Sequence, residues 1–174
     1  MKRVIIVGAP GSGKSTLARG IAGKTGLPIT HLDSLYFDPQ QRYNQHRTAW
    51  AQRLSELAAA DSWIIEGCHA VDLAPHAARA DVIILLDYPR RVIVWRIMSR
   101  FVKQRGGDPP EMPEGWREVF DTNARRWWFE LALNFPRTFK HELAVLLKPT
   151  AGKQRLILSN PAQAKTYLNA MIEP

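Results

Sequence analysis

Short apolar runs separated by longer helical patterns organise this chain. The runs are rich in Val, Ile and Leu and do not alternate with polar residues, which is typical of strands buried on both faces of a sheet. A weaker run covers Pro28–Leu32. The four clear runs are Val4–Val7, Trp63–Ile65, Val82–Leu86 and Leu156–Leu158. We predict a strand at each run.

Apolar residues at helical spacing fill the intervals between these runs. The first stripe begins at Leu17 and ends before Gly26, a residue suited to terminating a helix. Other helices are predicted around Trp50, from Pro89 to about Gln104, from Phe120 to Leu131, and after Asn160-Pro161. Strands that alternate with helices indicate an α/β fold with a parallel, doubly wound sheet. The 174 residues suit a single domain, 1–174.

One long irregular segment interrupts this alternation. Residues 106–115 are polar, contain three prolines and lie between two predicted helices. A loop of this length in a compact domain is often functional. We therefore expect a lid region at approximately 102–126.

Composition narrows the classes of function. The net charge of +8 and the pI of about 10.0 fit either nucleic-acid binding or a cleft for polyphosphates. Acidic residues are scattered through the basic stretches, which favours the phosphate cleft. The lone Cys68 excludes a disulfide framework. No apolar stretch approaches the roughly 20 residues that span a bilayer, so we expect a cytoplasmic protein that does not cross membranes.

The segment from Gly8 to Ser15 carries the strongest chemical signal. It matches the phosphate-binding loop G-x-x-x-x-G-K-[ST] directly after a predicted strand and before a predicted helix. Such a loop directs backbone N–H groups at phosphates, the lysine reaches the β and γ phosphates, and the hydroxyl ligates Mg²⁺. The predicted nucleotide ligands are Gly8, Gly11, Ser12, Gly13, Lys14, Ser15 (also the Mg²⁺ ligand) and Thr16. They predict binding of ATP or GTP.

Carboxylates follow three of the other predicted strands, at Asp33, Glu66 and Asp87. Ligands of open α/β sheets bind at the carboxyl ends of strands. Asp33 and Glu66 are candidates for orienting a phosphoryl acceptor or supporting Mg²⁺, and either could have either role. Gly67 would let a substrate approach the backbone. Asp87 is equally explained as a helix cap.

Arginines supply candidates for binding the transferred phosphoryl group. Arg96 and Arg100 have i, i+4 spacing and share a helical face. Arg125 and its neighbour Arg126 could close over the nucleotide or could pair with nearby carboxylates. Trp127-Trp128 continue an apolar stripe, which favours a core role over base stacking.

In order along the chain, the phosphate loop and the segments 31–37, 63–67 and 80–90 resemble the adenylate-kinase-related P-loop proteins often labelled topology modulation proteins. The resemblance implies a three-layer fold, a five-stranded parallel sheet of order 2-3-1-4-5, Mg²⁺ and ATP, and a small lid. It also implies an acceptor-side helix region at approximately 40–60, which contains Arg47, and it implies that Arg96 and Arg100 stabilise phosphate. Adenylate kinases carry a different turn where this chain has Gly67-Cys68-His69-Ala70.

Two functions follow. The first is an ATP-dependent kinase of a small molecule, such as a nucleoside monophosphate, with Lys14, Asp33, Glu66, Arg96 and Arg100 as catalytic residues. The second is an ATP-binding regulator that acts on DNA topology or on a partner. The carboxylates and the arginine pair favour the kinase, whereas only the basic charge supports the regulator.

Overall fold

A parallel sheet of five strands forms the centre of the molecule, in the order β2-β3-β1-β4-β5. The computed structural model describes residues 1–36, 46–104 and 122–171, and for 100–104 and 122–128 it describes the backbone only. The strands are β1 (Arg3–Gly8), β2 (Ile29–His31), β3 (Trp63–Gly67), β4 (Val82–Leu86) and β5 (Gln154–Leu158). This order confirms the predicted sheet.

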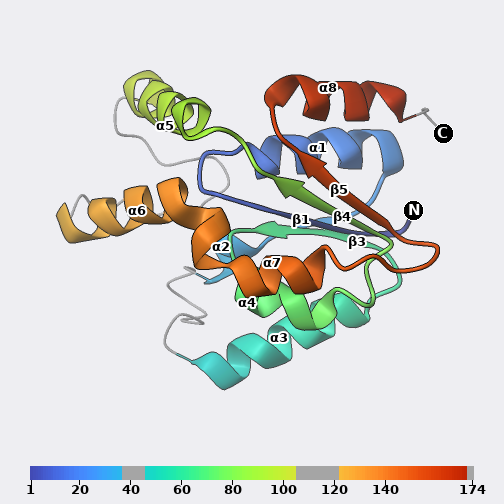
Figure 1. Cartoon of the computed structure of the whole chain (residues 1–174). Coiled ribbons are helices and arrows are strands. Elements are labelled where there is room, and N and C mark those ends of the chain that lie inside the picture. The colour runs from blue at the N-terminus through green and yellow to red at the C-terminus, as the bar shows by residue number, and fades with distance from the viewer. Residues whose placement is uncertain (37–45, 105–121, 172–174) are drawn as a thin grey trace.

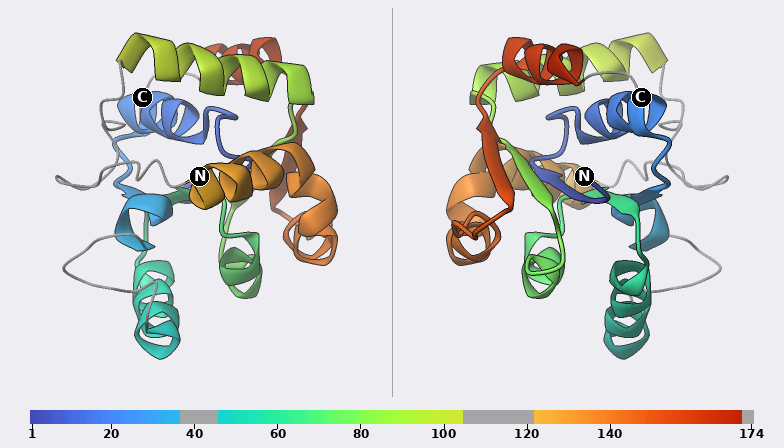
Figure 2. Two further views of the ribbon diagram at one scale, coloured as in Figure 1. Left: turned by 90° about the vertical axis from the view of Figure 1, so that its left-hand side faces the viewer. Right: turned by 90° about the vertical axis from the view of Figure 1, so that its right-hand side faces the viewer.

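The helices alternate with the strands along the chain. Their bounds are α1 (Lys14–Thr25), α2 (Leu32–Tyr36), α3 (Arg47–Ala59), α4 (Ala70–Leu73), the 3₁₀ helix η2 (Ala74–His76), α5 (Arg90–Gln104), α6 (Thr122–Thr138), α7 (Lys140–Leu146) and α8 (Pro161–Ala170). Figures 1 and 2 show α1, α5 and α8 on one side of the sheet and α3, α4 and α7 on the other. The result is the three-layer arrangement that the alternating pattern predicts.

The core of the sheet consists of strands that are buried on both faces. Every residue of β3 and β4 is buried, as is β1 after Arg3. β1 pairs with β3 on one side and with β4 on the other, so Val7 lies beside both Gly67 and Leu85. Continuous apolar runs are needed for such strands, which explains why these elements were visible in the sequence.

The termini of α1 and α8 also match their sequence signals. Gly26 ends α1 in the left-handed conformation, with φ of 69°, and its N–H donates to the carbonyl of Ala22. Asn160 caps α8 by accepting a hydrogen bond from the backbone N–H of Gln163, and Pro161 takes the first turn. Helix ends specified by such local chemistry could be predicted without knowledge of the fold.

The region after β2 differs from the prediction. β2 ends at His31, and Asp33 lies in the first turn of α2 rather than at the end of a strand. Leu32 is the first residue of this helix, and its side chain is buried. Helices α4 and α7 were not predicted either. The expected lid at 102–126 lies largely outside the described residues.

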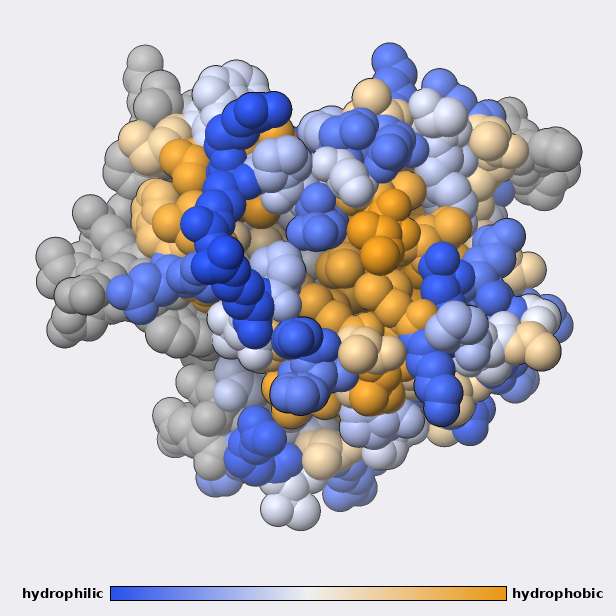
Figure 3. Space-filling model, viewed as in Figure 1, coloured by the Kyte–Doolittle hydropathy of each residue, from blue (hydrophilic) through white to orange (hydrophobic). Residues whose placement is uncertain are grey.

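The surface of the described molecule carries exposed apolar side chains. Figure 3 shows apolar side chains gathered near the centre of the face seen in Figure 1. Elsewhere on the surface, Trp95 of α5 is 67% exposed. Within the described ranges, no helix combines the length and the apolar character that a membrane span requires.

Candidate functional site

The phosphate loop joins the end of β1 to the start of α1. Gly11 and Gly13 have φ of 78° and 94°, values that L side chains rarely adopt. Gly13 immediately precedes α1, so the backbone turns into the helix N-terminus at this point. A loop that curls around an anion with its N–H groups facing inward needs glycine at such positions.

Helix α5 supports this loop from outside. Arg96 donates from Nη1 to the carbonyl oxygen of Ser12 at 2.7 Å, and its guanidinium lies 5.3 Å from the centre of the Tyr88 ring. A Cβ on Gly13 would lie 2.7 Å from the same Nη1, and a Cβ on Gly11 would meet Ile97 at 2.7 Å. Gly11 is therefore favoured by packing against Ile97 as well as by conformation, whereas at Gly13 the flexible Arg96 side chain can move and the positive φ is the main constraint.

Lys14 and Ser15 begin α1 beside the carboxyl ends of β1 and β3. Lys14 is buried, and its amine donates to the carbonyl of Ala9 at 3.2 Å. The Ser15 hydroxyl donates to Oε1 of Glu66 at 2.9 Å. The buried Ser12 hydroxyl has no hydrogen-bond partner among the described residues. A buried cation and a buried hydroxyl in a glycine loop fit a bound polyphosphate.

Glu66 lies at the end of β3, next to the phosphate loop. Its side chain is 3% exposed, and Oε1 also contacts Nδ1 of His31 at 2.5 Å. Within the described part of the chain, its second oxygen, Oε2, is buried without a hydrogen-bond partner. A carboxylate that touches the serine of a phosphate loop and keeps one oxygen unpaired fits a role in supporting Mg²⁺ through water.

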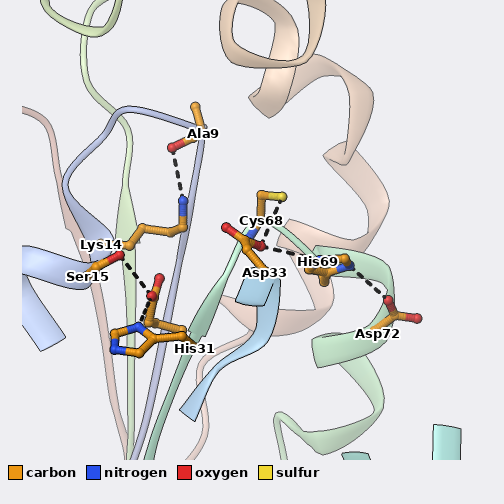
Figure 4. A network of polar contacts seen from close by, with 9 residues as sticks. Ala9, Lys14, Ser15, His31, Asp33, Cys68, His69 and Asp72 are labelled. Atoms are coloured by element: carbon orange, nitrogen blue, oxygen red, sulfur yellow. Dashed lines mark hydrogen bonds and ion pairs between the residues drawn. The ribbon is translucent and has the colours of Figure 1, made fainter. Parts of the chain in front are cut away.

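Asp33 lies on the other side of Lys14 and belongs to a second group of polar side chains (Figure 4). Its Oδ1 accepts hydrogen bonds from the Cys68 backbone N–H at 3.2 Å and from the Cys68 thiol at 3.4 Å. Nε2 of His69 lies 3.3 Å from the same oxygen, and Nδ1 of His69 lies 3.3 Å from Oδ2 of Asp72. Four side chains from α2 and the β3–α4 region thus form one network.

The electrostatics of this network follow from burial and pairing. Burial alone would raise the pKa of Asp33, but the hydrogen bond from His69 and the charge of Lys14 outweigh it and hold that pKa far below its usual range. Burial likewise opposes the charge on His69, yet the two carboxylates raise its pKa to about 9. Burial and the nearby Asp33 raise the pKa of the Cys68 thiol well above its usual value. The network therefore contains ionised carboxylates, an imidazolium and a neutral thiol near neutral pH.

Gly67 is explained by packing. A Cβ at this position would lie 2.9 Å from the Cβ of Leu32 and 3.2 Å from Oδ1 of Asp33. The end of β3 therefore approaches the start of α2 too closely for a side chain. The approach of a substrate to the backbone at Gly67 stays a prediction.

The remaining predicted site residues have mixed outcomes. Gly8 ends β1 against β4, where a Cβ would lie 2.8 Å from the carbonyl oxygen of Leu86, and Thr16 is exposed on α1. Arg47 begins α3 and is exposed. The side chains of Arg100 and Arg125 lie outside those that the structure describes. Their predicted contacts with phosphate stay predictions.

His69 is the residue that sequence reasoning missed. Its two partners lie 36 positions before it and three positions after it in the chain. The second spacing, His69 to Asp72, was visible as an i, i+3 pair. The first pairing depends on α2 lying beside the end of β3, which no local pattern indicated.

Comparisons with known proteins agree with this geometry. Residues 4–87, slightly under half of the chain, match the profile of the ATPase family associated with various cellular activities (AAA). No curated protein shows significant sequence similarity to the chain. The solved structures with a similar fold include a shikimate kinase from Acinetobacter baumannii in complex with shikimate, with 15% identity and a TM-score of 0.58 over 97% of this chain and 89% of that chain.

Two sugar-related kinases are similar to the same extent. A sugar kinase from a Janibacter species has 20% identity and a TM-score of 0.54, covering 97% of this chain and 93% of the other. A gluconokinase from Sinorhizobium meliloti 1021 has 16% identity and a TM-score of 0.53, with 97% and 91% covered. The chain has the P-loop kinase-like fold. At these identities the P-loop kinase-like fold is shared, and the adenylate-kinase-related grouping stays a prediction.

Proposed function

We propose that this P-loop kinase-like protein is a phosphotransferase that moves the γ-phosphoryl group of Mg²⁺-ATP to a hydroxyl group of a small molecule. The observation that carries the proposal is that two carboxylates near the phosphate loop belong to separate polar networks. Glu66 touches Ser15 of the phosphate loop, whereas Asp33 lies in its own network at the start of α2. This separation supports one role on the nucleotide side and one on the acceptor side.

On the nucleotide side, the loop glycines, Lys14 and Ser15 would hold the phosphates and the metal. The Ser15 hydroxyl would ligate Mg²⁺, and Glu66, 2.9 Å from that hydroxyl, would accept a hydrogen bond from a metal-bound water. Bound Mg²⁺ would offset the negative charge of the phosphate oxygens. Lys14 would stabilise the charge that develops on the transferred group.

On the acceptor side, the low pKa of Asp33 argues for orientation rather than for proton removal. A carboxylate with so depressed a pKa is a weak general base. Phosphoryl transfer through a loose transition state requires positioning more than early deprotonation. Asp33 would therefore accept a hydrogen bond from the acceptor hydroxyl and aim its oxygen at the γ-phosphorus. As the new O–P bond forms and the bond to the leaving oxygen of ADP breaks, the hydroxyl proton would pass to an oxygen of the transferred phosphoryl group.

The negative charge of Asp33 also indicates which class of acceptor the site would bind. An ionised carboxylate accepts a hydrogen bond from a hydroxyl group, and it repels the phosphate monoester, which is mostly a dianion at neutral pH, more strongly than the single charge of a hydroxy acid. We therefore favour a polyol or a hydroxy acid over a nucleoside monophosphate. The solved structures with a similar fold include a shikimate kinase, a sugar kinase and a gluconokinase. The compounds in these three names carry hydroxyl groups, which adds support for a hydroxyl acceptor.

A panel of acceptors with radiolabelled ATP and Mg²⁺ tests this function. Shikimate, gluconate, a set of hexoses and AMP serve as probes, and ATP consumption that depends on one hydroxyl compound is the expected result. The variant Asp33→Asn should lose about 10²-fold or more of that turnover while it still binds ATP. Phosphorylation of AMP alone would replace this proposal with a nucleotide kinase. Salt-sensitive DNA binding without any acceptor-dependent turnover would favour the regulatory alternative.

A further inference from the structure

His69 lies between two carboxylates at the edge of the candidate acceptor side. It immediately precedes α4, and its side chain is 13% exposed. One ring nitrogen faces Asp33 and the other faces Asp72, each at 3.3 Å. Because both nitrogens meet carboxylate oxygens, the ring satisfies both partners only when both nitrogens carry a proton.

Aromatic side chains hold the plane of this ring. The ring of Tyr36 lies 4.7 Å from the His69 ring between centroids, and that of Trp50 lies 5.6 Å away. Tyr36 and Trp50 also pack against each other edge to face at 5.1 Å. Trp50 is buried within the core, so this support comes from a rigid part of the fold.

The neighbours of Asp33 all contact the same one of its two carboxylate oxygens. The Cys68 backbone N–H, the Cys68 thiol and His69 all meet Oδ1. Figure 4 shows the Asp33 carboxylate between His69 and the phosphate loop residue Lys14. Among the described residues no hydrogen bond is directed to Oδ2, so that oxygen is the one positioned to accept an outside donor.

We propose that His69 is a positioning residue that fixes the Asp33 carboxylate by its Oδ1, with Asp72 as its anchor, so that Oδ2 is presented to the acceptor hydroxyl. This role deepens the proposed function and rests on it for the acceptor. Asp72 holds the second nitrogen and thereby prevents the ring from turning away. The pKa of about 9 for His69 means that the clamp is charged at neutral pH.

A metal ion is the competing explanation for this cluster. The ligand atoms of Asp33, Cys68 and His69 lie within 4.8 Å of one another. In the metal-free protein, Nε2 of His69 and the Cys68 thiol both carry protons, which a metal ion would have to displace. Asp33, Cys68 and His69 would supply only three ligands, because Asp72 faces the other ring nitrogen. We therefore favour a clamp, and a Zn²⁺ titration tests the metal centre.

The variants His69→Gln and His69→Asn separate positioning of Asp33 from mere filling of space. The glutamine amide nitrogen can replace Nε2 and still donate to Asp33, whereas the shorter asparagine amide replaces Nδ1 and reaches Asp72. His141→Asn is the matched control because His141 is exposed on α7. With the acceptor panel of shikimate, gluconate and hexoses, we expect His69→Asn to lose about 10²-fold in kcat/KM for the acceptor. His69→Gln should retain more, and the KM for Mg²⁺-ATP should stay unchanged in all three.

An NMR measurement tests the clamp even if no probe is phosphorylated, in which case the proposed function fails separately. In the unaltered protein, the His69 ring nitrogens should keep imidazolium shifts at pH 7.5, and the Asp33 carboxyl carbon should titrate at a higher pH in both His69 variants. A neutral His69 ring at pH 7.5 would overturn the proposal. So would equal acceptor kinetics in the two variants and the control, or stoichiometric Zn²⁺ binding that Cys68→Ser abolishes.

Discussion

Raising the pH from 6.5 to 9 should weaken the folded state because His69 loses its proton over this range. Its pKa is raised from 6.5 to about 9 in the folded protein, although burial opposes the charge, because a carboxylate oxygen of Asp33 and one of Asp72 each lie 3.3 Å from a ring nitrogen. A raised folded pKa stabilises the protein fully below the unfolded pKa, and this stabilisation disappears as the pH rises through the folded pKa.

The size of this effect follows from the shift. Each pKa unit corresponds to about 1.4 kcal/mol, so His69 contributes about 3 kcal/mol of unfolding free energy below pH 6.5 and little of it above pH 9. The depressed pKa values of Asp33 and Asp72 keep both carboxylates charged throughout this range. His76 has a lowered pKa, mainly through burial, and therefore changes stability only at lower pH. Cys68 is the other group near the upper limit, because its unfolded thiol ionises near 9.0 while burial keeps the folded thiol protonated.

Urea unfolding, followed by tryptophan fluorescence at constant ionic strength, measures this dependence. The unaltered protein and His69→Gln should differ most at pH 6.5 and converge toward pH 9, and the difference between them removes the contribution of Cys68. His141→Asn should follow the unaltered protein at every pH. Parallel curves for the protein and His69→Gln would refute the ion triad as a source of stability.

Three further substitutions test the phosphate loop and its surroundings. Lys14→Ala should abolish detectable ATP binding in calorimetric titration while the circular dichroism spectrum stays unchanged, and an unaltered affinity would contradict the loop assignment. Glu66→Gln should lower turnover by about 10²-fold and shift its Mg²⁺ dependence to higher concentrations; an unchanged Mg²⁺ titration would remove Glu66 from the metal side. Gly67→Ala should lower the free energy of unfolding by about 1–3 kcal/mol, because its Cβ would lie 2.9 Å from that of Leu32. Gly23→Ala is its control, since nothing lies within 4 Å of a Cβ there, and equal urea midpoints for the two would contradict the packing argument.

Most of the sheet could be predicted from the sequence because its three central strands are of one kind. β1, β3 and β4 are buried on both faces and therefore appear as unbroken apolar runs. The short β2 is different, since its three residues are only partly buried and no apolar pattern marks its end. For this reason we expected Leu32 in the strand and Asp33 at its end, whereas both residues belong to α2.

The nucleotide side and the acceptor side of the site also differed in how far the sequence predicted them. The phosphate loop could be predicted because one continuous segment contains all its essential groups, and the backbone of that segment does much of the binding. Glu66 was found because it ends a strand beside the loop. The acceptor side has no such continuous segment, so its residues had to be assembled from α2 and from the turn after β3.

The assembly of the acceptor side is a consequence of sheet order rather than of any motif. β2 pairs with β3, and His31 lies in register with Glu66, so the residues that follow each strand emerge side by side. Asp33 follows one strand by two positions and Cys68 directly follows the other, which brings the Asp33 carboxylate to the Cys68 N–H. The absence of a side chain on Gly67 permits this approach, and His69 then reaches the carboxylate from the next position. A histidine two positions after a strand end and three residues before an aspartate therefore indicates such a network only once the neighbouring strand is known.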